Sequence, residues 1–167
     1  ASIEQAAKQD PLTSLPTENI DSKQFYTVKL KGEYLYNPQF HIAARYHNSQ
    51  LGYHVITPFK TNKGSVVLVN RGWIPVTMKK DELTPPEGNQ QIIGQIRIGA
   101  ERNPFTPESQ PEKNMWFGRD VELMAQTGGL STPPYMLDLV VAEPAEGIYP
   151  IAFDGHVQLR NDHLSYV

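Results

Sequence analysis

The sequence predicts a mainly β domain, an antiparallel barrel or a sandwich-like sheet with one or two short helices. Six or so short segments alternate apolar and polar residues, which is typical of strands with one buried face. Glycine and proline separate these segments, and little of the chain has helical periodicity. The 167 residues are enough for one core that buries about two thirds of the surface of the unfolded chain. We therefore expect a single soluble domain over residues 1–167.

The first 22 residues are predicted to form a short helix and a linker. Ser2 and Gln5 have the spacing of a capping box, alanines follow, and Pro11 stops the pattern, which indicates a helix over residues 3–9. Residues 11–22 are rich in Pro, Thr, Ser, Asn and Asp, which is typical of a connecting loop. A β-rich core is then expected over residues 23–160.

The first half of this core is predicted to contain a strand, a hairpin and another strand. Residues 26–34 alternate apolar and polar side chains. A hairpin then joins residues 53–57 to residues 65–74, and Pro58 is expected to end its first strand. The charged residues 78–91 are expected to form a surface loop, and residues 92–98 a further strand.

The second half begins with a long polar stretch, residues 101–114, which contains three prolines. A loop of this length is uncommon in a compact domain unless it has a task or lies across the structure. Residues 120–128 are the clearest helix, with Asp120 suited to its N-cap and Gly128 to its end. Two last strands are predicted, over residues 135–143 and 156–161.

The composition excludes several classes of function. A formal net charge of -3 and a pI of about 5.9 give no basic field, so a nucleic-acid partner is not expected. The absence of cysteine excludes disulfides, Cys-based zinc sites, iron–sulfur clusters, thiol catalysis and covalent haem attachment. No window reaches the roughly 18 to 20 apolar residues of a membrane span.

No pattern predicts an active site, so we expect that the chain is not an enzyme. A Gly-x-Ser-x-Gly turn is absent, and the glycine pair at residues 128–129 lies at the wrong end of a helix to bind phosphate. The methionines are scattered, which gives copper binding little support. No metal site is expected, because the histidines lack zinc-ligand spacing and an acidic cluster. Four of them are expected to be ordinary surface or half-buried residues: His41, His47, His54 and His156.

The stretch "VVLVNRGWIPV" is the most unusual segment, because an apolar strand runs into Asn70, Arg71, Gly72 and Trp73. On a regular strand Val67, Val69, Arg71 and Trp73 would share one face. Gly72 permits a bulge, and Pro75 indicates an edge or an end. Two interpretations stay open: a strand end with a buried tryptophan, or an exposed Asn-Arg-Trp patch that binds a partner.

Four segments together resemble the Surfeit locus protein 1 family of cytochrome c oxidase assembly factors. They are "GYHVITPF", "VLVNRGWIP", "NMWFGRDVELMA" and "RNDHLSYV", in this order, and the resemblance runs from about Gly32 to the last residue. It implies two transmembrane helices that flank a soluble domain in the bacterial periplasm or the mitochondrial intermembrane space. Residues 161–167 would then lead into the second helix, and we expect the periplasmic face of a bacterial inner membrane.

The resemblance also implies a function in building haem–copper oxidase, at the stage where haem a enters subunit I. Its expected partners are subunit I and haem a synthase, its cofactor is transiently bound haem a, and His163 matches a proposed haem ligand. Members of the family act as chaperones rather than as enzymes. Two alternatives remain: a scaffold for oxidase subunits that never binds haem, and a β-barrel that holds an apolar ligand in its mouth.

Overall fold

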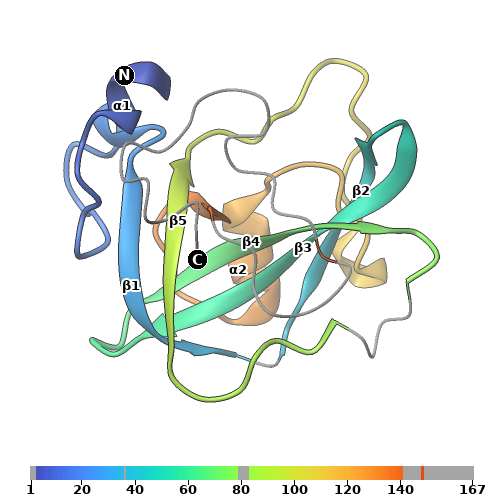
Figure 1. The fold of residues 1–167 in the computed structure, drawn as a ribbon. Coiled ribbons are helices and arrows are strands. Elements are labelled where there is room, and N and C mark those ends of the chain that lie inside the picture. The colour runs from blue at the N-terminus through green and yellow to red at the C-terminus, as the bar shows by residue number, and fades with distance from the viewer. Residues whose placement is uncertain (1–2, 36, 79–82, 141–147, 149–167) are drawn as a thin grey trace.

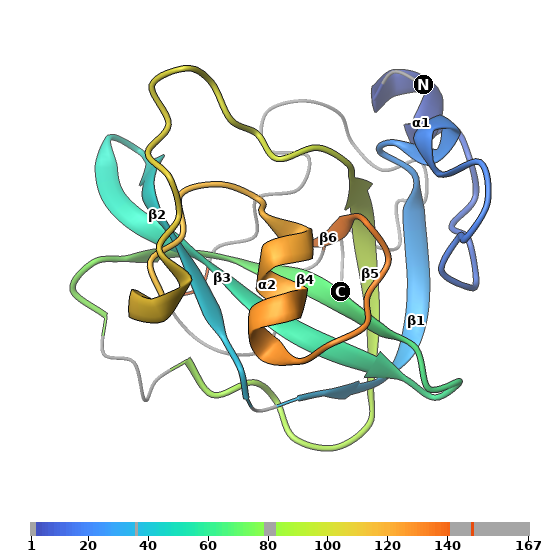
Figure 2. The ribbon, with the colours of Figure 1, turned by 180° about the vertical axis from the view of Figure 1, so that it is seen from behind.

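A computed structural model describes residues 3–35, 37–78, 83–140 and 148. Its strands form a closed barrel, and helix α2 packs on the outside of that barrel (Figures 1 and 2). The prediction of a mainly β fold with short helices is confirmed. The elements in chain order are α1 (Ile3–Ala7), the 3-10 helix η1 (Ile20–Lys23), β1 (Thr27–Tyr34), β2 (Phe40–His47), β3 (Gln50–Thr61), β4 (Val66–Pro75), β5 (Gln90–Arg97), the 3-10 helix η3 (Pro111–Lys113), α2 (Val121–Gly128) and β6 (Met136–Leu139).

Five strands close the barrel in the order β1-β5-β6-β4-β3, because β1 pairs with β3 over Gly32–Tyr34. β2 is an extra strand that pairs with β3. The expectation of a purely antiparallel sheet is wrong at one pairing, since β4 and β6 are parallel. A parallel pair needs a long crossover connection, and here β5, the polar loop and α2 supply it.

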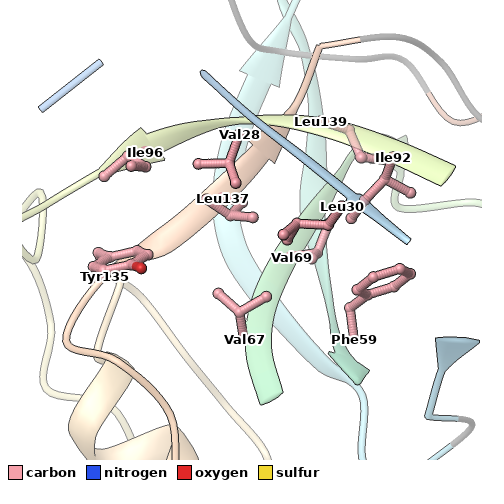
Figure 3. Packing of buried hydrophobic residues seen from close by; sticks show 10 residues of the cluster. All are labelled: Val28, Leu30, Phe59, Val67, Val69, Ile92, Ile96, Tyr135, Leu137 and Leu139. Carbon is pink, nitrogen blue, oxygen red and sulfur yellow. The ribbon is translucent and has the colours of Figure 1, made fainter. Parts of the chain in front are cut away.

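The hydrophobic side chains of all five barrel strands meet in the barrel interior. Figure 3 shows this cluster, in which Val67 and Val69 of β4 face Leu137 of β6. The alternate residue Leu68 points outward and joins a second cluster beneath α2, together with Trp116 and other residues. One strand therefore packs on both faces, which explains its continuous apolar sequence.

The prediction that Pro58 ends the first hairpin strand is wrong, because β3 continues to Thr61. On one edge β3 pairs with β2 up to Ile56, and then with β1 from Phe59. Pro58 lies where the partner strand changes, so its missing N–H group interrupts no ladder there. Its carbonyl oxygen accepts a hydrogen bond of 2.9 Å from the backbone N–H of Leu35.

β2 was not predicted from the sequence. A register shift between Ile42 and Arg45 and a positive φ of 57° at Ala44 interrupt its alternation. The long polar stretch lies across the structure, and its continuation covers the edge of β2, since the N–H of Ala43 donates to the carbonyl oxygen of Trp116 at 2.7 Å. Covering a sheet edge in this way prevents pairing with other chains.

Both predicted helices are present, with differences at their ends. α1 is shorter than residues 3–9. In α2 the side chain of Asp120 does not cap the helix. The helix ends at Gly128, as predicted, and Gly129 in the left-handed conformation is its C-cap. Of the last two predicted strands, the structure describes β6, while residues 156–161 lie outside the described part. No helix in the described ranges is long and apolar enough to span a membrane.

The packing of β6 predicts the effect of Leu137→Ala. Leu137 is fully buried in the barrel, so the substitution should lower the free energy of unfolding by about 2–5 kcal/mol. Leu123→Ala is the matched control, because Leu123 is 37% exposed on α2 and should change stability by only about 0.5 kcal/mol. Urea denaturation measures both, and equal losses would contradict the burial of Leu137 in the barrel interior.

Candidate functional site

The segment Asn70–Trp73 lies in the interior of the structure, at a bulge of β4. Val55 pairs with Gly72 and Ile56 pairs with Asn70, so Arg71 is the extra residue. Gly72 has a φ of 135°, which favours glycine. Asn70 and Arg71 are fully buried and Trp73 is 2% exposed. These side chains therefore do not form an exposed patch on the described structure.

Asn70 stabilises the bulge through its amide. Its Oδ1 accepts a hydrogen bond of 3.0 Å from the backbone N–H of Gly72, and its Nδ2 lies 3.3 Å from Nδ1 of His54. A side chain that bonds to the backbone two residues ahead holds a local turn in place. The amide thus links the bulge to the neighbouring strand.

Arg71 donates hydrogen bonds to segments on both sides of β4. Its guanidinium donates to the carbonyl oxygen of Leu83 at 2.6 Å and to Oε1 of Gln39 at 2.7 Å, and it lies 5.8 Å from the ring centre of Tyr34. A weaker bond of 3.3 Å reaches Oγ1 of Thr57. The planar, multidentate guanidinium suits such a set of acceptors. Arg71 therefore joins β4 to the chain before β2 and to the chain before β5.

Trp73 lies on the opposite face from Val69, contrary to the expectation that the two share a face. The bulge shifts the alternation, so Trp73 pairs with His54. The indole N–H donates to the carbonyl oxygen of Arg45 at 3.1 Å, and the ring lies 5.1 Å from that of His47. A Cβ atom at Gly52 would overlap the indole, which explains the glycine at that position.

A second group of polar residues lies beside this bulge, at the neighbouring strand β6. Asp138 pairs in register with Asn70 and is fully buried. Its two carboxylate oxygens accept hydrogen bonds of 2.7 and 2.8 Å from the guanidinium of Arg119. Glu101 lies 3.1 Å from Nε of Arg119 and 2.6 Å from Arg97, which completes a network of two acids and two arginines.

Charge interactions outweigh burial in this network. Burial lowers the pKa of Arg119, but Asp138 and Glu101 more than offset that effect, so the pKa is raised. Burial raises the pKa of Glu101, but Arg119 and Arg97 bring it below its usual value. Arg119 and Glu101 are therefore charged at neutral pH, and the network is a structural ion cluster.

Sequence analysis did not identify Arg119 and Asp138 as site residues. The segment "NMWFGRDVELMA" carries part of the resemblance, and its pattern indicates a helix with Asp120 as the cap but gives Arg119 no role. Asp120 instead accepts hydrogen bonds of 2.9 and 2.6 Å from Arg102, which fastens the long polar loop. A lone acid in the apolar strand "YMLDLVV" was the available signal, since a buried charge needs a partner.

Three histidines lie within the described residues and are half-buried: His41, His47 and His54. No three His, Cys, Asp or Glu side chains gather as metal ligands in the part of the chain that the structure describes. His156 and His163 lie outside the described residues. The expectation for His163 thus stays a prediction.

Arg71→Ala should lower the free energy of unfolding by about 2–4 kcal/mol, because the buried carbonyl oxygen of Leu83 would lose its donor and the amide oxygen of Gln39 would keep only Thr57. Arg71→Lys should recover part of this loss, since an ammonium group reaches fewer acceptors. Thermal denaturation measures both variants. An unchanged melting temperature in Arg71→Ala would contradict the structural role of this side chain.

His54 should make stability depend on pH. Burial lowers its pKa to about 3, and the positive charges of Arg119, Arg45 and Arg97 add to that effect. Below pH 6.5 the unfolded chain binds a proton that the folded chain does not, so stability falls as the pH drops toward 3. We expect a loss of about 1 kcal/mol per pH unit between pH 6.5 and 5.

His54→Gln should reduce this slope in urea denaturation series, whereas the control His47→Gln should keep it. NMR titration of the His54 ring gives a direct check. A ring that titrates near pH 6.5 in the folded chain contradicts the expectation.

The family model and the individual relatives that match this sequence agree on one protein family. The model of the SURF1 family matches residues 1–167. Surfeit locus protein 1 of Mus musculus is 30% identical over 190 residues, which cover 100% of this chain and 60% of the mouse protein. The Homo sapiens protein of the same name is 38% identical over 127 residues, 72% of this chain and 40% of its own length. A SURF1-like protein of Caenorhabditis elegans is 29% identical over 188 residues, 99% of this chain and 57% of its own length.

The chain thus spans about 60% of the length of the mouse relative. The family model covers every residue of the chain, including both segments that meet at β4 and β6. The chain belongs to the SURF1 family.

Proposed function

We propose that the chain assists the assembly of haem–copper cytochrome c oxidase, at the stage where haem a enters subunit I. The observation that carries this proposal is the match of all 167 residues to the SURF1 family. Its members are known as assembly factors of cytochrome c oxidase. Subunit I and haem a synthase are the proposed partners, and the periplasmic face of a bacterial inner membrane is the proposed location.

The proposed role is that of a chaperone without catalytic chemistry. The burial of the distinctive polar side chains supports it, because Arg71 and Arg119 direct their guanidinium groups to protein acceptors. A catalytic group needs access to a substrate. These arginines instead stabilise the barrel on which a contact surface can be held in place.

The proposed haem ligand is His163, which matches the histidine of the family's motif in "RNDHLSYV". A neutral imidazole is a common axial ligand of haem iron. Haem a would bind only in transit, and part of its site would be formed by chain that follows residue 167 in the family. Binding without further chemistry is sufficient for a delivery step.

A scaffold that binds oxidase subunits and no haem is the second candidate. The hydrogen bonds and ion pairs of the barrel favour this scaffold role. They hold the bulge of β4, the ion cluster and the long polar loop in place, and so they fix the outer surface. The scaffold predicts that subunit I co-purifies with the protein when haem a synthesis is blocked. Haem delivery predicts that this association weakens without haem a.

His163→Ala should lower the amount of haem a that co-purifies with the intact, membrane-anchored protein. Cells that synthesise haem a are required, and the haem is identified by its absorption spectrum. His156→Ala is the matched control, because it removes a histidine seven residues earlier and should leave the haem content unchanged. Equal haem content in wild type and His163→Ala would remove the ligand assignment and favour the scaffold.

A further inference from the structure

A groove of about 1010 Å³ lies beside β1, on the edge of β1 that is opposite its pairing with β5. β1 pairs with β3 only from Gly32 to Tyr34. Before that point its free edge is contacted by Leu12, whose carbonyl oxygen accepts from the N–H of Lys29 at 2.8 Å. The groove is lined by residues of the N-terminal segment, of β1 and of the turn that joins β3 to β4.

The walls of the groove are fixed by hydrogen bonds. The N–H of Asn62 in the β3–β4 turn donates to the carbonyl oxygen of Lys31 at 2.9 Å. Across the groove, the hydroxyl of Tyr135 donates to the carbonyl oxygen of Pro16 at 2.9 Å. A cavity with such walls is formed before a ligand arrives, which reduces the entropy lost on binding.

The groove combines an apolar floor with a polar rim. Leu15, Leu30 and Val66 line it, and Leu15 and Leu30 belong to or pack against the barrel core. Hydroxyl groups on three segments supply hydrogen-bond donors around them: Thr13, Ser14, Thr17, Thr61, Ser65, Ser131 and Thr132. This pattern is typical of sites for ligands that are apolar over most of their surface.

The charge of the rim is positive, although the whole chain has a net charge of -3. Lys29, Lys31 and Lys63 line the groove and are exposed, and none of the described lining residues is Asp or Glu. Lys29 and Lys31 are two residues apart on one strand, so their side chains project on the same side about 7 Å apart. The rim therefore favours an anionic group.

We propose that this groove binds a small anionic amphiphile, with its apolar chain on Leu15, Leu30 and Val66 and its carboxylate or phosphate group near the lysines. The inference is independent of haem delivery, since it does not involve the proposed ligand His163, and the bulge of β4 is not among the described residues that line the groove. It differs from a ligand held inside the barrel, because core side chains fill the interior.

Calorimetric titration of the purified chain with oleate, below its micelle concentration, tests the proposal. Oleate or oleoyl lysophosphatidic acid should bind, and uncharged monoolein should bind at least about fivefold more weakly. Binding by oleate identifies a carboxylate ligand, and binding only by the lysophospholipid identifies a phosphate ligand. Absence of binding by both anions overturns the proposal.

Two variants test each part of the site. Lys31→Gln with Lys63→Gln should weaken binding about fivefold to tenfold, whereas the charge-matched pair Lys60→Gln with Lys113→Gln, outside the groove, should not. Val66→Thr keeps the side-chain shape but makes the floor polar, and should also weaken binding. All of these positions are exposed or half-buried, so melting temperatures should stay unchanged. Equal weakening by the two lysine pairs would show a non-specific charge effect and overturn the site.

Discussion

The buried ion pair between Arg119 and Asp138 is the interaction on which the rest of the structure depends. β6 has only four residues, yet it fills the place between β4 and β5 and thereby closes the barrel. Its Asp138 is fully buried, and an unpaired carboxylate there would be strongly unfavourable. Two hydrogen bonds from Arg119 stabilise it. Loss of one partner from such a pair typically costs about 3–5 kcal/mol.

The position of Arg119 connects this pair to the outer layer. Arg119 lies two residues before Val121, where α2 begins, and it follows Trp116, which packs beneath that helix. Glu101 extends the network to the start of the long polar loop. Closure of the barrel, placement of α2 and anchoring of the loop therefore share one set of charges. Asn70 lies beside Asp138, so the bulge of β4 is built against the same group.

The sequence was sufficient to predict the fold class and most strands, because alternation in segments such as residues 26–34 reflects burial on one face. It failed where tertiary pairing overrides local pattern. Pro58 continues a strand because partner strands change beside it, and the irregular β2 loses its alternation at Ala44. The parallel placement of β6 depends on contacts distant in the chain, which no local pattern records.

The candidate site was predicted only in part, for a physical reason. Gly72 signalled a bulge, and a bulge is present. Arg71 donates to the backbone carbonyl oxygens of Leu83 and Thr84, which any residue supplies, and to the side chain of Gln39, which lies far from it in the sequence. No local pattern therefore indicates these partners. Asp120 has the sequence position of a helix cap, but its carboxylate binds the guanidinium of Arg102 instead, because hydrogen bonds between two charged groups are stronger than a bond to a neutral backbone N–H group.

Arg71 and Arg119 belong to two of the segments that carry the family resemblance, and their burial changes how a variant at these positions is interpreted. Arg71 and Arg119 stabilise the barrel, so their loss would reduce the amount of folded protein before any contact with a partner protein is tested. A loss of the proposed assembly function in such a variant is therefore not evidence for a contact at these residues. A residue that contacts a partner protein must be exposed. Three exposed hydrophobic residues lie next to one another: Tyr46 of β2 pairs with Leu51 of β3, and the carbonyl oxygen of Leu51 accepts a hydrogen bond from the N–H of Val76. Variants at exposed positions that keep the melting temperature can distinguish a loss of partner binding from a loss of folding. Variants of the buried motifs cannot, because they change both.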